Sequence, residues 1–120
     1  MAPIIRLSEF RRRRQTGFFT RAELNQLLSL YSRQVTRGQW RDYAIRHADG
    51  KAVFAVFRHS HETALYTIVK SAPQGALKGE FTVLSGRLPL ARSPMLGQVL
   101  AQLQKTLRHQ IVLLDSERSR

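Results

Sequence analysis

The side chains best suited to chemistry in this sequence are arginines, and four of them are consecutive. Arg11, Arg12, Arg13 and Arg14 carry permanent positive charge, and each guanidinium presents paired donors that match the oxygens of a phosphate. Basic and aromatic side chains recur later in the chain, and we single out Arg33, Arg37, Arg41, Arg46, Phe57, Tyr66 and Lys70. Cations beside aromatic rings hold phosphates and stack bases. These residues are our candidate nucleic-acid-binding site.

The net charge also favours a polyanionic partner. Twenty Lys and Arg residues against eight Asp and Glu residues give +12. Residues 1–19 carry +4 and residues 20–114 carry +8, so the expected folded body is itself basic. A field of this sign attracts nucleic acid, anionic membranes or acidic proteins. The alternative is a basic composition that serves solubility alone.

Sequence patterns typical of catalysis are missing. Neither a G-x-G-x-x-G motif nor a lysine-bearing phosphate loop occurs, and no serine lies in a nucleophile elbow. His59 and His61, with Glu62 or Asp42, are the nearest approach to a metal site, but spacing fixes no third ligand, so we interpret the histidines as polar turn residues. We expect a non-enzymatic protein without metal or cofactor.

Composition also bears on location. The chain has no cysteine, which excludes disulfides and thiolate metal sites. It has no stretch near the roughly 18 apolar residues of a membrane helix, no lipidation motif, and no apolar run of signal-peptide length after its basic start. We therefore expect a cytoplasmic protein that does not bind membranes.

Charge and apolar spacing divide the chain into three segments. Residues 1–17 are expected to be a basic, largely flexible arm because adjacent like charges repel. Residues 18–114 are expected to form a single α+β domain, and residues 115–120 a disordered tail. The first helix is expected at about 21–36, where Thr20 and Glu23 match a capping box. Its apolar stripe is expected to comprise Leu24, Leu27, Leu28, Tyr31 and Val35.

Alternating polarity then predicts an antiparallel β-meander of about five strands, at residues 41–47, 52–58, 64–70, 80–84 and 87–91. Asp49-Gly50 is typical of a two-residue hairpin turn, and Pro89 places the last strand at an edge. Ser93-Pro94 begins a C-terminal helix packed on one sheet face. That helix either continues past His109 or breaks there before a short final strand.

Counting residues through the first two hairpins assigns side chains to sheet faces. The count pairs Arg46 with Val53 and Val56 with Leu65. It places Tyr43, Ile45, Phe54, Val56, Leu65, Thr67 and Val69 under the helices, and Asp42, Ala44, Arg46, Val53, Ala55, Phe57, Tyr66, Ile68 and Lys70 on the other face. If that second face is open, Arg46, Phe57, Tyr66 and Lys70 form a basic–aromatic platform for bases. If a helix or partner chain covers it, they are core residues, and a slip of one residue reverses the assignment.

Two stretches resemble a known family. They are Arg6-Leu-Ser-Glu-Phe-Arg-Arg-Arg-Arg with Gly17-Phe-Phe-Thr-Arg-Ala-Glu-Leu, and Gly38-Gln-Trp-Arg-Asp-Tyr-Ala-Ile with Ala52-Val-Phe-Ala-Val-Phe-Arg-His-Ser-His-Glu. They resemble the domain-of-unknown-function family 2794, found mainly in alphaproteobacteria. The resemblance implies a bacterial cytoplasmic protein and no established activity or site residues.

The hypothesis that follows is a non-enzymatic protein that binds RNA or DNA. The alternative is an interaction module that docks on an acidic partner protein or self-associates through its sheet.

Overall fold

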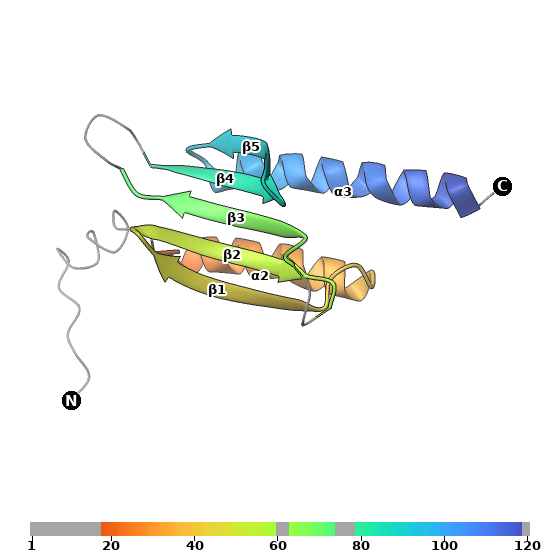
Figure 1. Cartoon of the computed structure of the whole chain (residues 1–120), viewed down its shortest axis with the longest axis horizontal. Helices are drawn as coiled ribbons and strands as arrows, with labels where there is room; N and C mark the ends of the chain where they lie inside the picture. Colours follow the sequence, from red (N-terminus) through yellow and green to blue (C-terminus); the bar gives the residue numbers. More distant parts are fainter. Residues whose placement is uncertain (1–17, 60–62, 74–78, 119–120) are drawn as a thin grey trace.

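The structure is a computed structural model that describes residues 18–59, 63–73 and 79–118, and for residues 111–118 it describes the backbone alone (Figure 1). The predicted arm, residues 1–17, lies outside the described residues.

Helix α2 (Arg21–Thr36) begins at the predicted capping box. The hydroxyl oxygen of Thr20 accepts a hydrogen bond from the N–H of Glu23 at 3.2 Å, and a Glu23 carboxylate oxygen accepts one from the N–H of Thr20 at 2.8 Å. Both bonds satisfy amides that a helix start leaves without partners. The buried face of α2 differs from the expected stripe, because Leu27, Leu30 and Gln34 are buried whereas Val35 is 41% exposed.

Five strands form one antiparallel sheet in sequence order, as predicted: β1 (Asp42–Ala48), β2 (Lys51–Phe57), β3 (Tyr66–Ser71), β4 (Glu80–Ser85) and β5 (Leu88–Ser93). Each strand end lies within two residues of its expected position. In the first turn Asp49 has φ 54° and Gly50 has φ 72°, the positive values that a tight hairpin turn requires. Pro89 lies in the edge strand β5, where its missing N–H costs no ladder bond.

The predicted register is correct for the first hairpin and wrong for the second. Arg46 pairs with Val53 as expected, but Val56 pairs with Tyr66 instead of Leu65. This shift of one residue turns every β3 side chain to the opposite face. No two-residue turn signal fixes the β2–β3 connection. Burial therefore decides the register, and it favours Ile68 over Thr67 beneath the helices.

Helix α3 (Leu96–Arg118) runs without a break through His109, so the alternative final strand does not form, and it continues past the expected domain boundary at residue 114. It begins at Leu96 rather than at the expected Ser93-Pro94, because Ser93 is the last residue of β5. The hydroxyl oxygen of Ser93 accepts a hydrogen bond from the N–H of Met95 at 3.1 Å in the turn between the two elements.

Both helices cover the same face of the sheet, α2 behind β1 and β2 and α3 behind β4 and β5 in the view of Figure 1. The core between the two layers contains Leu27, Leu30, Trp40, Ala52, Phe54, Val56, Tyr66, Ile68, Phe81, Val83, Leu96, Val99, Leu100, Leu103 and Leu107. The chain is therefore an α+β protein of two layers. No helix of the described residues covers the opposite sheet face.

Candidate nucleic-acid interface

The basic–aromatic platform expected on one sheet face does not assemble. Arg46 is exposed and Phe57 half-buried on the uncovered face. The corrected register puts Tyr66 and Lys70 on the opposite face, beneath the helices, where they are 5% and 7% exposed. The four side chains therefore cannot form one surface, and the expectation for Tyr66 and Lys70 was wrong because it rested on the β2–β3 register.

Lys70 and Tyr66 have polar partners inside the fold. The ammonium of Lys70 donates to a carboxylate oxygen of Glu23 at 2.8 Å and to the backbone oxygen of Phe18 at 2.7 Å. The hydroxyl of Tyr66 donates to the side-chain oxygen of Gln110 at 3.0 Å. A buried ammonium requires such partners, and here they attach β3 to the start of α2.

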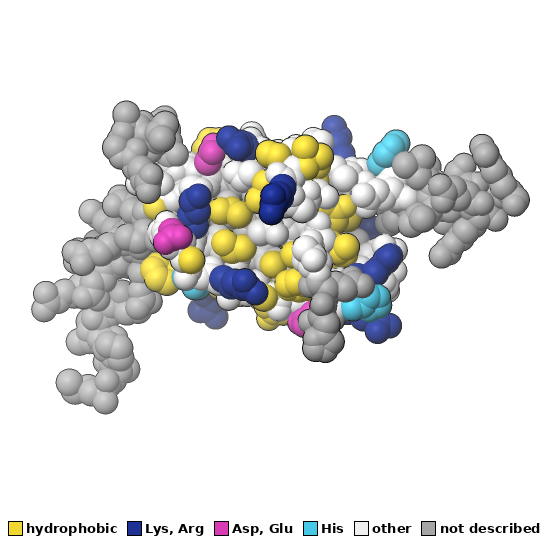
Figure 2. Space-filling model, in the orientation of Figure 1, with side chains coloured by type: hydrophobic (Ala, Val, Ile, Leu, Met, Phe, Trp, Pro, Cys, Tyr) yellow, Lys and Arg dark blue, Asp and Glu magenta, His cyan; other side chains and the backbone are white. Residues whose placement is uncertain are grey.

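The uncovered sheet face carries apolar side chains interspersed with basic groups and a few acidic ones, as Figure 2 shows. By register its side chains include Val53, Ala55, Phe57, Thr67, Val69, Thr82 and Leu84, together with Asp42, Arg46 and Arg92. Phe57 is the aromatic residue among them. One ring amid aliphatic side chains offers little stacking surface for bases.

A more concentrated basic site lies on the helix side. A hollow of about 100 Å³ opens between α2 and α3, and we call it the interhelical hollow. Its described lining residues are Leu30, Arg33, Gln34, Arg37, Gln104 and Arg108. Arg33 and Arg37 were predicted as phosphate contacts, and the fold brings them together with an arginine of the second helix.

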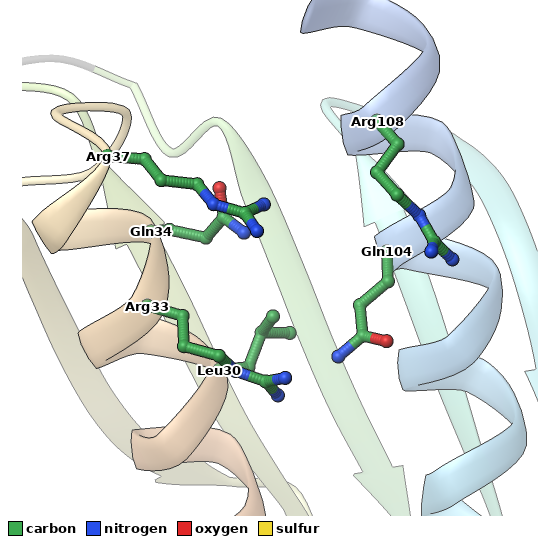
Figure 3. A pocket seen from close by; sticks show the side chains of 6 residues that line it. All are labelled: Leu30, Arg33, Gln34, Arg37, Gln104 and Arg108. Atoms are coloured by element: carbon green, nitrogen blue, oxygen red, sulfur yellow. The ribbon is translucent and has the colours of Figure 1, made fainter.

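The side chains of the interhelical hollow project from both walls (Figure 3). Arg33, Gln34 and Arg37 extend from α2 toward α3, Gln104 extends from α3 toward α2, and Arg108 lies along α3. None of the described residues that line it is a carboxylate. Three arginines therefore line one hollow without a described lining group of opposite sign, which favours an anion there.

Gln34 is the unusual member of this lining. It is 2% exposed, and its side-chain oxygen has no hydrogen-bond partner. Glutamine is usually exposed, and a buried amide oxygen without a donor costs about 1–3 kcal/mol. Its backbone oxygen is satisfied, because it accepts from the N–H of Gln39 at 2.9 Å and of Trp40 at 3.4 Å. The unmet requirement lies in the side chain alone.

Sequence reasoning missed Gln34, Gln104 and Arg108, although spacing carries a signal for each. Gln34 follows Leu27 by seven positions and Leu30 by four, which puts it on the buried face of a helix. Gln104 and Arg108 are four residues apart and each follows a buried leucine of α3, so they lie side by side at the margin of its apolar face.

The remaining candidates lie elsewhere. Arg41 is exposed just before β1, and its backbone N–H donates to Phe57 at 2.8 Å. Arg11–Arg14 fall outside the described residues, as do His61 and Glu62 of the considered metal site. Within the described part of the chain, no three His, Asp or Glu side chains lie close enough to hold a metal ion.

Tyr31, a residue of α2, has a shifted pKa. Burial raises the pKa of Tyr31 above its ordinary value, and the negative charge of Asp42 and the neighbouring Tyr43 raise it further. The ring centres of Tyr31 and Tyr43 are 4.8 Å apart. The shift arises from packing between α2 and β1, away from the interhelical hollow.

The fold and this site define a small basic α+β protein whose two described helices cover one face of a five-stranded sheet, with an arginine-lined hollow between them. Residues 17–100 match the sequence model of the family described as "Protein of unknown function (DUF2794)", and the chain belongs to that family, as the resemblance indicated. Gln104 and Arg108 lie just beyond the matched residues. Comparison with curated proteins and with solved structures gave no match. Neither described helix combines the length and apolar character needed to span a bilayer.

Proposed function

We propose that this protein binds nucleic acid, without catalysing a reaction on it, through the basic surface on its helix side. The observation that carries the proposal is the gathering of Arg33, Arg37 and Arg108 around one hollow that no described carboxylate lines. Guanidinium groups arranged in this way match phosphate oxygens in geometry as well as charge. The net charge of +12 adds a long-range attraction to the same partner.

The helix dipole explains the positions of these three arginines less well than a bound anion does. Basic residues near the C-terminus of α2 stabilise the helix dipole by about 0.3–1 kcal/mol each, which could explain Arg33 and Arg37. It does not explain why Arg108, from a different helix, lines the same hollow. A shared anionic ligand explains all three positions at once.

The proposal extends to the parts of the chain around the interhelical hollow. Arg41 follows α2 closely and would contact the next phosphate along a bound strand, and Arg11–Arg14 would contact more distant ones. The absence of cysteine and the family resemblance support a place in the bacterial cytoplasm, where nucleic acid is abundant.

Salt dependence of binding tests this function directly. Fluorescence anisotropy with labelled single-stranded RNA, single-stranded DNA and duplex DNA gives the affinity at several salt concentrations. Each phosphate neutralised contributes about 0.7–0.9 to the slope of log affinity against log salt. Because Arg33, Arg37 and Arg108 share one anion, the triple variant Arg33→Gln, Arg37→Gln, Arg108→Gln should lower the slope by about 0.7–0.9.

Arg87→Gln is the matched control, because Arg87 is exposed in the β4–β5 turn, outside the interhelical hollow. It should leave the slope unchanged, because Arg87 does not line the interhelical hollow. An unchanged slope in the triple variant would remove the interhelical hollow from the interface. No measurable binding of the full chain at low salt would end the proposal itself.

The uncovered sheet face favours a second candidate function, self-association with another copy of this chain. Its central side chains Val53, Ala55 and Val69 have no described helix over them. The same face carries Asp42 as well as Arg46 and Arg92, so two copies meeting there can pair opposite charges. Antiparallel sheets commonly pack face to face in this way.

Analytical ultracentrifugation tests this alternative. Val69→Glu places a charge at the centre of the face and should convert a dimer to a monomer. A wild-type chain that sediments as a monomer at the highest concentration reached would refute it.

A further inference from the structure

We infer that the interhelical hollow binds one terminal phosphate, a phosphate monoester at the end of a nucleic acid strand, in preference to a phosphodiester inside the strand. This inference rests on the proposed function, since it names the chemical group that the arginine cluster recognises.

Size restricts the ligand to a small group. Pockets that enclose a drug-sized molecule or cofactor measure about 300–1,000 Å³, whereas the interhelical hollow measures about 100 Å³. A phosphate group fits such a volume and a nucleoside does not. The base and sugar would then remain outside, between the exposed ends of Arg33 and Arg108.

Charge and geometry favour a monoester over a diester. A phosphodiester carries one negative charge and has two oxygens free of ester bonds. A terminal monoester has three such oxygens and carries a charge near −2 at neutral pH, because its second pKa is about 6. Three arginines line the interhelical hollow, Arg33, Arg37 and Arg108. Arg33 and Arg37 extend toward it from α2, whereas the Arg108 side chain lies along α3 (Figure 3) and turns toward α2 when it meets a bound anion. A guanidinium fork spans two oxygens. The three free oxygens of a monoester make three such pairs, one for each arginine, whereas the two free oxygens of a diester make one.

Gln34 gives independent evidence for a ligand, because its buried side-chain oxygen has no hydrogen-bond partner. Figure 3 shows its amide beside the Arg37 guanidinium in this view, with the nitrogen on the side toward Gln104. Its NH₂ group can donate to a bound phosphate. Its unpartnered oxygen can then accept from a guanidinium that the anion draws inward, since each guanidinium has five N–H donors and an anion occupies few of them. Gln34 is thus a binding and positioning residue that is fully satisfied when the anion is bound.

The test compares oligonucleotides that differ at one end. Anisotropy competition uses one short single-stranded sequence with a 5′-phosphate, a 3′-phosphate or hydroxyls at both ends, at constant ionic strength. Inorganic phosphate is titrated separately, with sodium chloride as the ionic-strength control, and the melting temperature of the full chain is recorded. The variants are Arg37→Gln and Arg108→Gln, with Arg87→Gln as the matched control.

We expect an end-phosphorylated strand to bind about tenfold more tightly than the strand with two hydroxyl ends. Arg37→Gln and Arg108→Gln should abolish most of that difference, and Arg87→Gln should preserve it. The preference should also decline below about pH 6, where the monoester gains a proton. If Arg37→Gln and Arg108→Gln lower the affinity for all three strands and leave the end preference intact, the arginines act through general electrostatic attraction, and the inference is refuted.

The outcomes separate this inference from the proposed function. Equal binding of the three strands overturns terminal-phosphate recognition and leaves nucleic-acid binding standing. The proposed function would be refuted if none of the strands binds while inorganic phosphate raises the melting temperature of the wild-type chain but not that of Arg37→Gln. In that case the interhelical hollow would be a site for a free phosphate group.

Discussion

Replacing Gln34 by methionine should make this protein more stable and less responsive to phosphate. Gln34 is 2% exposed, and its side-chain oxygen has no hydrogen-bond partner. Methionine has nearly the same length and no polar requirement, so Gln34→Met removes the unmet hydrogen bond without opening a large cavity. The backbone bonds from Gln39 and Trp40 to residue 34 are unaffected.

The size of the effect follows from the burial of this oxygen. An unsatisfied buried polar group costs about 1–3 kcal/mol, and an imperfect fit of the methionine side chain returns part of that. We expect a net gain of about 1 kcal/mol in the free energy of unfolding, which raises the melting temperature of a domain of this size by about 4 °C. In saturating phosphate the wild-type chain should gain about 3 kcal/mol by linkage, and Gln34→Met clearly less.

Urea and thermal unfolding, each with and without phosphate at constant ionic strength, measure both quantities. Gln104→Met is the matched control, because Gln104 also lines the interhelical hollow but is only half-buried. It should change the stability of the free protein by less than about 0.5 kcal/mol. A destabilised Gln34→Met variant would refute the reasoning, since it would mean that the amide already has a partner in the free protein.

Three further predictions concern the fold that holds the site. In urea denaturation, Lys70→Met should lower the free energy of unfolding by about 2–3 kcal/mol, because the carboxylate of Glu23 loses its buried cation. Adding Glu23→Gln should lower it much less than a second independent substitution would. Gly50→Ala should lower the free energy of unfolding by about 1 kcal/mol in thermal denaturation, because Gly50 has φ 72°, and a larger loss would point to a packing role that its open surroundings exclude. Because the pKa of Tyr31 is raised in the fold, its stabilising contribution is complete below pH 10.0 and is lost as the pH rises through the folded-state pKa; Tyr31→Phe should reduce the fall in stability measured on alkaline titration.

Local signals in the sequence were sufficient for most of the fold. The capping box at Thr20 and Glu23 placed the start of α2, and Asp49-Gly50 set the register of β1 and β2. Both patterns act within a few residues, so the chemistry that produces them can be read directly from neighbouring positions. The helix-then-meander order was predicted for the same reason.

The β2–β3 register could not be predicted because no local signal determines the length of that connection. An error of one residue reversed the faces of Tyr66 and Lys70, and with them half of the expected platform. Lysine is almost never buried without a partner, and the partner of Lys70 is Glu23, 47 positions away. That pairing depends on how β3 lies beside the start of α2, which no local pattern records.

The interhelical hollow was half predictable for a related reason. Arg33 and Arg37 are basic residues on one helix, so their charge alone identified them as candidate phosphate contacts. Arg108 joins them because both helices lie on the same face of the sheet and side by side, a property of the tertiary packing. Gln34 was missed because the expected stripe of α2 was rotated toward Val35.

The two proposed surfaces lie on opposite sides of the sheet, and this has a consequence for how they would work together. A dimer joined through the uncovered sheet face would leave both copies of the interhelical hollow exposed on its outer sides. Two linked sites raise the apparent affinity for a partner that spans both of them, through effective concentration. Val69→Glu would then weaken binding to long nucleic acids and leave the affinity for a short end-phosphorylated strand unchanged. Equal weakening for long and short strands would instead mean that the sheet face itself contacts the nucleic acid.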